Sequence, residues 1–146
     1  MRLKRDVDYP KGRLQVADRR PDGTLGKWRI VLDVAAFAAR EGKAYTLNWS
    51  YRSSCLPSVH SRCLLGFSDG GGDDLMLREF DFETGDFVDG GFTAPAGRVQ
   101  SAWIDADTVL IAHAGEGDHR TAAGWAAAAR LWRRGQALSD ATVIFT

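Results

Sequence analysis

Two stretches of this chain carry the same order of short strands and tight turns, and this internal repeat constrains the fold more than any other feature. Residues 63–65 superpose on residues 110–112 with an offset of 47, and residues 78–80 superpose on residues 130–132 with an offset of 52. A longer loop in the second copy accounts for the difference. A unit that repeats after roughly 40–50 residues cannot bury both of its faces alone and has to stack on a neighbour.

Each copy contains four predicted strands joined by turns. The runs of the first copy are residues 45–51, 62–68, 75–82 and 87–88, and those of the second are residues 101–104, 108–113, 129–133 and 142–145. Four short antiparallel strands per repeat are typical of a β-propeller blade. We therefore predict an all-β fold of antiparallel, four-stranded, propeller-type blades, with about two to two and a half blades in the chain.

The turns between the runs set the predicted boundaries. We assign residues 1–43 to the end of one blade and a connection, residues 44–92 to the second blade and residues 93–146 to the third. The first of these segments has predicted strands at residues 13–17 and 28–32. It also has a short helix near residues 34–41, capped by Asp33 and stopped by Gly42. The alanine-rich residues 122–132 leave a second interpretation open, because their intrinsic propensity favours a helix.

Composition excludes several classes of protein. The chain has 146 residues, the size of one ordinary domain, and its 19 Lys and Arg balance its 19 Asp and Glu. Zero net charge disfavours a polybasic nucleic-acid binder, and 45% hydrophobic residues exclude wholesale disorder. The charge is uneven, since residues 1–29 hold nine basic and four acidic residues and residues 69–107 hold ten acidic and two basic ones. We interpret the basic start as a solvated face.

The expected location is the cytoplasm. No apolar run approaches the roughly 20 residues of a membrane span, and the charged start is unlike a signal peptide, so we expect no membrane partner. Cys55 and Cys63 lack the spacing of a zinc or redox motif, although His60 lies between them. We expect both cysteines to be reduced, packed thiols.

Five phrases of the sequence, in their order and spacing, resemble the amino-terminal part of the propeller in the prolyl oligopeptidase family of serine peptidases. They are residues 28–43, residues 63–65 with the glycine turn after them, residues 78–92, residues 103–110 and residues 131–135. Together the resemblance covers about residues 27–146. In that family the phrase similar to residues 78–92 leads from one blade to the next, and the phrase similar to residues 103–111 is the inner hairpin of the following blade.

This resemblance implies a role without chemistry of its own. Members of the family are several times longer than this chain, and their peptidase chemistry lies in an α/β-hydrolase domain that the propeller covers. The propeller of that family resembles a gate that admits short peptides and keeps folded proteins out. The chain would then correspond to part of the non-catalytic domain, and the catalytic half is absent from it.

One formal match to a catalytic motif stands against this interpretation. Residues 66–70 fit G-x-S-x-G with Ser68 as the nucleophile. The motif works only where a strand turns sharply into a helix, and the glycines after Ser68 do not start a helix readily. A serine, an aspartate and a histidine also follow one another along the chain in the order of a hydrolase triad. They are Ser68, Asp105 or Asp107, and His113 or His119. Aspartates are so frequent here that we expect Ser68 at a hairpin end and assign no catalytic residue.

Other candidate sites are weaker. Residues 69–74 carry carboxylates between glycines, but they lack the alternating ligands and the distal Glu of an EF-hand calcium loop. No Lys-Ser/Thr follows the glycines, so they do not match a phosphate loop. Trp103 and Trp132 fall at repeat positions, where packing between blades explains them. We assign no cofactor-binding and no metal-ligating residue and expect no cofactor.

The function predicted first is that of a non-catalytic propeller fragment of a prolyl-oligopeptidase-like serine peptidase, gating the access of short peptides to a hydrolase domain. The expected partners are the peptide substrate, met through the parent enzyme, and either the rest of the parent chain or a second copy, bound through open blade edges. The alternative is a stand-alone β-sheet interaction module without enzymatic activity. Neither interpretation involves nucleic acid.

Overall fold

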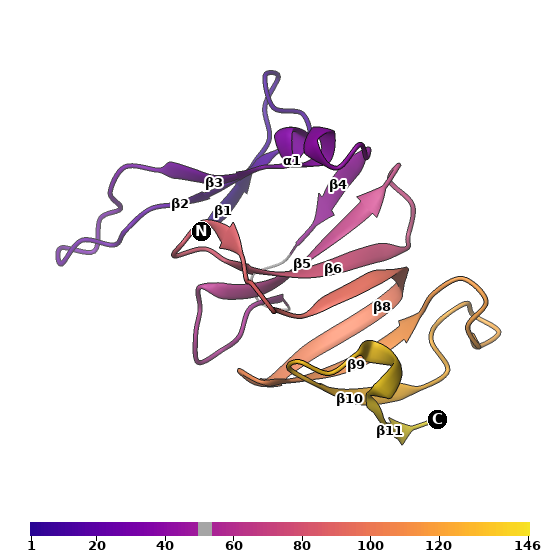
Figure 1. Ribbon diagram of the computed structural model, residues 1–146. Helices are drawn as coiled ribbons and strands as arrows, with labels where there is room; N and C mark the ends of the chain where they lie inside the picture. Colours follow the sequence, from indigo (N-terminus) through magenta and orange to yellow (C-terminus); the bar gives the residue numbers. More distant parts are fainter. Residues whose placement is uncertain (50–53) are drawn as a thin grey trace.

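A computed structural model describes residues 1–49 and 54–146 and shows a chain built mostly of antiparallel strands (Figure 1). Its elements are β1 (Arg2–Lys4), β2 (Arg13–Val16), β3 (Arg29–Asp33), α1 (Val34–Arg40), β4 (Tyr45–Asn48), β5 (Arg62–Asp69), β6 (Leu75–Asp81), β7 (Asp86–Phe87), β8 (Thr93–Asp105), β9 (Thr108–Ala114), β10 (Ala129–Arg133), the 3-10 helix η1 (Leu138–Asp140) and β11 (Thr142–Phe145). The prediction of an all-β fold with one short helix is confirmed. Ser50 and Tyr51, which belong to the predicted run at residues 45–51, lie outside the described residues.

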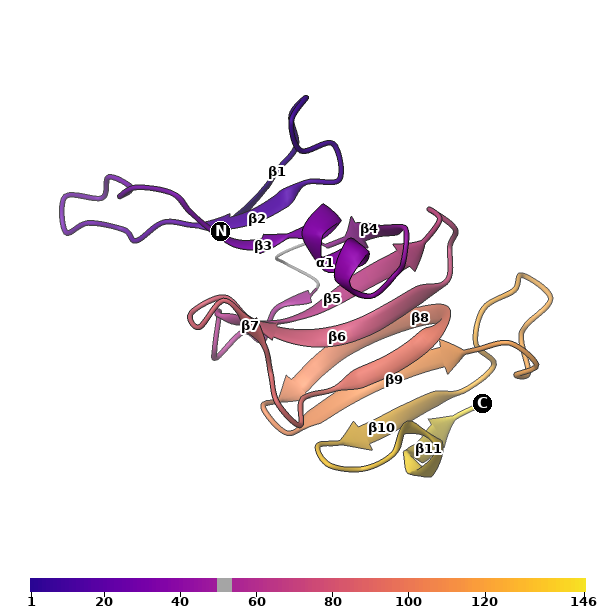
Figure 2. The same cartoon turned by 45° about the horizontal axis from the view of Figure 1, so that its top comes forward.

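The strands of the described residues form two sheets. The first has the order β1-β2-β3, and the second has the order β11-β10-β9-β8-β6-β5-β4, with β7 beside β6. Consecutive strands of the larger sheet pair as two antiparallel meanders, which we call the first meander (β4-β5-β6-β7) and the second meander (β8-β9-β10-β11). Figure 2 shows the three-stranded sheet, the first meander and the second meander one below another.

The meanders correspond to the two copies of the sequence repeat. Residues 63–65 and 110–112, which superpose in sequence, lie in β5 and β9, the second strands of their meanders. Residues 78–80 and 130–132 lie in β6 and β10, the third strands. Equivalent residues of the repeat therefore occupy equivalent strands.

β8 begins earlier than predicted. The predicted run starts at Ser101, whereas the strand starts at Thr93 and contains Pro95 and Gly97, residue types that usually interrupt a strand. In the structure the first part of β8 pairs with β6 and the second part with β9, so one continuous strand passes from the first meander to the second. The register of the β6–β8 ladder shifts opposite Pro95, between Leu75 and Leu77, and this irregularity accommodates the proline.

The apolar core has two parts, and the first meander contributes to both. Side chains of β5 alternate between them, since Leu65 and Phe67 join the cluster against α1 and the three-stranded sheet, whereas Leu64 joins the cluster against the second meander. Trp132 of β10 and Phe92 before β8 are the large members of the second cluster, with ring centroids 4.9 Å apart. Burial on both faces explains why residues 63–67 are almost continuously apolar.

α1 and β10 settle two predictions about helices. The Asp33 carboxylate accepts a hydrogen bond from the Ala36 N–H at 3.0 Å and caps α1, and Gly42 after the helix has φ of 64°. The short helix near residues 34–41 is thus confirmed. The helical alternative for residues 122–132 is wrong, because β10 pairs with β9 there and buries Trp132. No helix of the described residues has the length and apolar character needed to cross a membrane.

Cys55 and Cys63 form a disulfide, so the expectation of reduced thiols is wrong. The chain between them folds back on itself: the Leu56 N–H donates to the Arg62 carbonyl at 2.8 Å, and the Val59 N–H donates to the Leu56 carbonyl at 3.2 Å. These turns place Cys55 opposite Cys63 in an isolated antiparallel bridge. A separation of eight residues matches no redox motif, so the spacing alone did not reveal the pair.

The disulfide predicts a thiol count and a stability change. The denatured chain should contain no free thiol before reduction and two after it, measured with a thiol-reactive dye. Reduction should lower the free energy of unfolding by about 2–3 kcal/mol in urea titrations, because a short loop is no longer closed in the unfolded chain. Two free thiols without reductant would contradict the pairing.

Candidate functional site

The G-x-S-x-G motif does not form a nucleophile elbow. Ser68 lies near the end of β5 and is buried, and its hydroxyl donates to the Gly72 carbonyl at 2.7 Å. The chain then turns directly into β6, so a strand and not a helix follows the motif. Ser68 therefore lies at a hairpin end, as the sequence predicts, and its proton is held within the turn.

The other members of the triad-like order have partners of their own. Asp107 lies at the β8–β9 turn, where its N–H donates to the Asp105 carboxylate at 2.8 Å. His113 lies six residues further along β9, about 20 Å from Asp107 in an extended strand. Its ring Nε2 donates to the Pro95 carbonyl at 2.8 Å. Within the described residues no hydrogen bond joins Ser68 to these groups, so they do not form a triad.

The carboxylates of the glycine-rich turn at residues 69–74 are paired with basic side chains. The pairs are Lys43–Asp69 at 3.2 Å, Arg98–Asp73 at 2.8 Å and Arg120–Asp74 at 3.6 Å. The Ala44 N–H and Lys43 lower the pKa of Asp69, so this carboxyl stays ionised. In the part of the chain that the structure describes, no group of three or more His, Cys, Asp or Glu could hold a metal ion. The turn is thus a neutralised acidic surface.

Glu79 of β6 is a carboxylate buried in the protein, with 1% of its surface exposed. It lies on the same face of β6 as Leu77 and directly opposite Leu64 of β5. Both leucines belong to the core shared with the second meander. Strand alternation therefore directs this charge into the boundary between the meanders, where it needs a partner.

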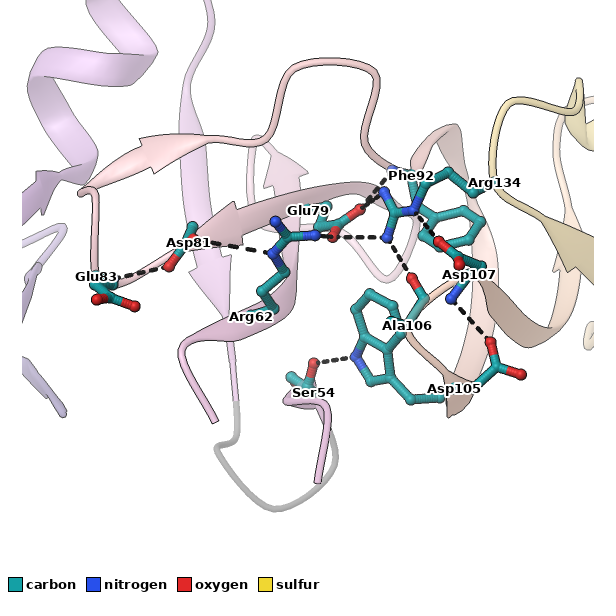
Figure 3. A network of polar contacts seen from close by, with 11 residues as sticks. Ser54, Arg62, Glu79, Asp81, Glu83, Phe92, Asp105, Ala106, Asp107 and Arg134 are labelled. Carbon is teal, nitrogen blue, oxygen red and sulfur yellow. Dashed lines mark hydrogen bonds and ion pairs between the residues drawn. The ribbon is translucent and has the colours of Figure 1, made fainter. Parts of the chain in front are cut away.

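Arg134, in the turn after β10, is that partner (Figure 3). Its Nη1 lies 2.8 Å from Glu79 Oε2 and its Nη2 lies 3.1 Å from Oε1, a bidentate pair. The Phe92 N–H also donates to Oε2, at 2.9 Å, and Arg62 of β5 approaches Oε1 at 3.6 Å. One carboxylate thus ties β6, the segment before β8 and the end of β10 together.

The turn between β8 and β9 holds Arg134 in place. Arg134 Nε donates to the Asp107 carboxylate at 2.9 Å, and its guanidinium lies 4.7 Å from the Phe92 ring centroid. Hydrogen bonding to Glu79 raises the pKa of Arg134, so its charge is permanent. A side chain at position 91 would lie 2.9 Å from Glu79 Oε2, which explains Gly91 beside the pair.

The network positions strands and does not carry out acid–base chemistry. Each oxygen of Glu79 already contacts two donors among the described residues, so the carboxylate is occupied in holding the network together. The sequence interpretation missed both Glu79 and Arg134. The available signal was the period of two along β6, which places Glu79 on the face of Leu77.

Removal of the Arg134 charge tests this network. Arg134→Gln should lower the free energy of unfolding by about 3 kcal/mol, because the buried Glu79 carboxylate loses its closest cation and keeps the Phe92 N–H and the more distant Arg62. Arg133→Gln is the matched control, since Arg133 is exposed and its substitution should change stability by less than about 0.5 kcal/mol. Urea denaturation of both variants at neutral pH makes the comparison, and equal midpoints would contradict the assignment.

Comparison with known proteins relates this chain to larger peptidases, although no protein-family model matches it. It is 36% identical over 119 residues to the uncharacterized peptidase y4nA of Sinorhizobium fredii, covering 82% of this chain and 16% of that protein. It is 27% identical over 128 residues to the uncharacterized peptidase RP174 of Rickettsia prowazekii, covering 81% of this chain and 17% of that protein.

A solved structure shares the fold. It is that of a post-proline cleaving enzyme from Rickettsia typhi, with a TM-score of 0.81 and 24% sequence identity, and the match covers 98% of this chain and 22% of that one. The chain therefore spans less than a quarter of each of these proteins. The resemblance found in the sequence is confirmed: over most of its own length the chain is similar to proteins named peptidases, and it shares the fold of a post-proline cleaving enzyme.

Proposed function

We propose that this chain is a non-catalytic propeller segment of a prolyl-oligopeptidase-like serine peptidase, which gates the access of short peptides to a hydrolase domain outside it. The observation that carries the proposal is the fold likeness to a post-proline cleaving enzyme over 98% of the chain, with a TM-score of 0.81. The sequence identity of 36% to a peptidase supports it independently. The peptide substrate would meet this segment only through the parent enzyme, with neither nucleic acid nor membrane as partner.

The two meanders support the propeller part of the proposal. Each has four antiparallel strands, and they share an apolar core, as stacked blades do. The division into residues 1–43, 44–92 and 93–146 belongs to this proposal. In it, β8 of the third unit pairs with β6 of the second unit as well as with β9, and the Glu79–Arg134 pair fixes the relative position of the two units.

A gate that selects by size has to keep its shape, and the links between the meanders suit that task. The buried ion pair, the continuous β8 and the Phe92–Trp132 contact join the two meanders at several points. Sliding one meander past the other would leave the Glu79 charge buried without its main partner, which is costly. The segment would thus contribute a rigid wall, while the bond is cut elsewhere.

Cytoplasmic placement is also part of the proposal, and the disulfide bears on it. Disulfides are rare in the cytosol, and those that occur there are usually transient or respond to redox conditions. In a cytoplasmic protein the Cys55–Cys63 disulfide would then be reversible. Trapping of thiols with an alkylating reagent in intact cells measures its state directly.

Because the proposal assigns peptide cleavage to another domain, we expect this chain to have no peptidase activity. The purified 146-residue chain should not cleave a chromogenic peptide ending in proline, because the Ser68 hydroxyl already donates its hydrogen bond to the Gly72 carbonyl. Ser68→Ala should behave identically in the same assay. Cleavage that disappears in Ser68→Ala would overturn the assignment of catalysis to another domain.

The length of the natural polypeptide separates the gate from its alternative. An antibody raised against this chain should detect, in extracts of its source, a polypeptide several times larger than 16.0 kDa. A single band near that mass would instead support the stand-alone interaction module.

One observation fits the module as well as the gate. β11 is the edge strand of the larger sheet, and Val143, Ile144 and Phe145 are 47%, 50% and 73% exposed. An apolar edge with unpaired backbone groups pairs readily with another strand. The partner would be the rest of the parent chain in the gate, and a second copy of this chain in the module.

Light scattering tests the edge. The isolated chain should self-associate, and Ile144→Lys should shift it toward the monomer, because a lysine on an edge strand opposes pairing. Ile104→Lys is the control, since Ile104 is 58% exposed in β8, away from that edge. A monomer at every soluble concentration, or equal effects of both substitutions, would contradict self-association through β11.

A further inference from the structure

A cavity on the second meander combines apolar walls with nitrogen-bearing side chains. It has a volume of about 380 Å³ and lies against β9 and β10, with Ile111 and Leu138 among its apolar residues. Arg130, His113 and His119 contribute the nitrogen-bearing side chains. This volume lies within the range of small-molecule sites, and an apolar lining with a few polar groups is typical of them.

Arg130 is the fixed charge of this cavity. It lies in β10 directly opposite Ile111 of β9 and is partly buried. Among the described residues, no carboxylate forms an ion pair with it and no acceptor receives a hydrogen bond from it, whereas Arg98, Arg120 and Arg134 each have a carboxylate partner. A partly buried guanidinium gains most from a carboxylate, whose two oxygens match its parallel donors.

His113 forms a rigid part of the wall. Its Nε2 donates to the Pro95 carbonyl at 2.8 Å, which fixes the ring. A Cβ at Gly97 would lie 2.7 Å from the same nitrogen, so the glycine makes room for this packing. His119 is exposed at the cavity. The site is thus held in shape by β8 and β9 before any ligand arrives.

The charge balance selects the class of ligand. Asp118 also lines the cavity, and its carboxylate accepts a hydrogen bond from the Gly115 N–H at 2.7 Å. The parallel donors of the Arg130 guanidinium match the two oxygens of one carboxylate, whereas a phosphate dianion would be repelled more strongly by Asp118 than a monoanion and would lack a second guanidinium in the cavity lining. The apolar walls suit a hydrocarbon group attached to the anion.

We propose that this cavity binds a small monocarboxylate with an apolar body, and that Arg130 binds its carboxylate. The assignment rests on Arg130, His113 and the apolar walls, so it holds whether or not the chain belongs to a peptidase. The proposed gate assigns no role to this cavity.

Titration of the full chain with isobutyrate, followed by amide NMR shifts, tests the proposal. Isobutyrate should shift the amide resonances of the cavity residues saturably. Isobutyramide, its neutral analogue, should bind with an affinity at least about tenfold lower. Inorganic phosphate should also bind more weakly. Equal binding of isobutyramide, tighter binding of phosphate, or no saturable shift with isobutyrate would each overturn the proposal.

Variants on β10 assign the role of Arg130. Arg130→Gln should weaken isobutyrate about tenfold or more, because the charged hydrogen bonds are lost. Arg133→Gln, three residues along the same strand and on its other face, should leave the affinity within about twofold. Arg130→Lys keeps the charge without the planar donors and should lie between them, which also provides a measurement should the glutamine variant fold poorly. Unchanged affinity in a folded Arg130 variant would overturn the assignment.

Discussion

The ion pair between Glu79 and Arg134 is the contact on which the arrangement of the two meanders depends. It joins residues 55 positions apart in the chain, from β6 to the turn after β10. Such a pair adds little net stability compared with apolar side chains of the same size, but displacement of either partner leaves a buried charge alone. It therefore restricts how the meanders stack. Asp107, in the turn between β8 and β9, accepts a hydrogen bond from Arg134, so the ion pair also restricts the position of the β8–β9 hairpin.

The remaining structure follows from stacking layers that are apolar on the sides they share. The first meander is buried on both faces, so its strands carry apolar residues in succession, whereas the second meander shares one face and leaves β11 exposed at the sheet edge. β8 of the second meander also pairs with β6 of the first and so links the registers of the two meanders through the backbone. The Trp103 indole N–H donates to the Ser54 carbonyl at 3.0 Å and connects the disulfide-closed segment to the second meander. Covalent, apolar and ionic links thus reinforce one arrangement.

This arrangement bears on the kinship with larger peptidases. The chain spans 16% and 17% of its curated relatives and 22% of the solved enzyme. Its serine motif is a hairpin turn, its acidic turn is neutralised by arginine and lysine, and its deepest carboxylate is saturated with donors. The cavity around Arg130 differs from all of these, because there a cation lies among apolar residues without a carboxylate bound to it in the described part of the chain.

The sequence by itself determined the strand-rich fold, the capped helix after Asp33, the repeat of strand order and the kinship with peptidases. These properties depend on residues close together in the chain: the period of two, the turn residues and short phrases in a fixed order. Only the tertiary structure decided the Cys55–Cys63 disulfide, the early start of β8, the Glu79–Arg134 pair and the surroundings of Arg130. Each of these depends on which segments lie side by side after folding. A local sequence pattern predicts whether a side chain faces the core, but it does not predict which residue that side chain contacts there.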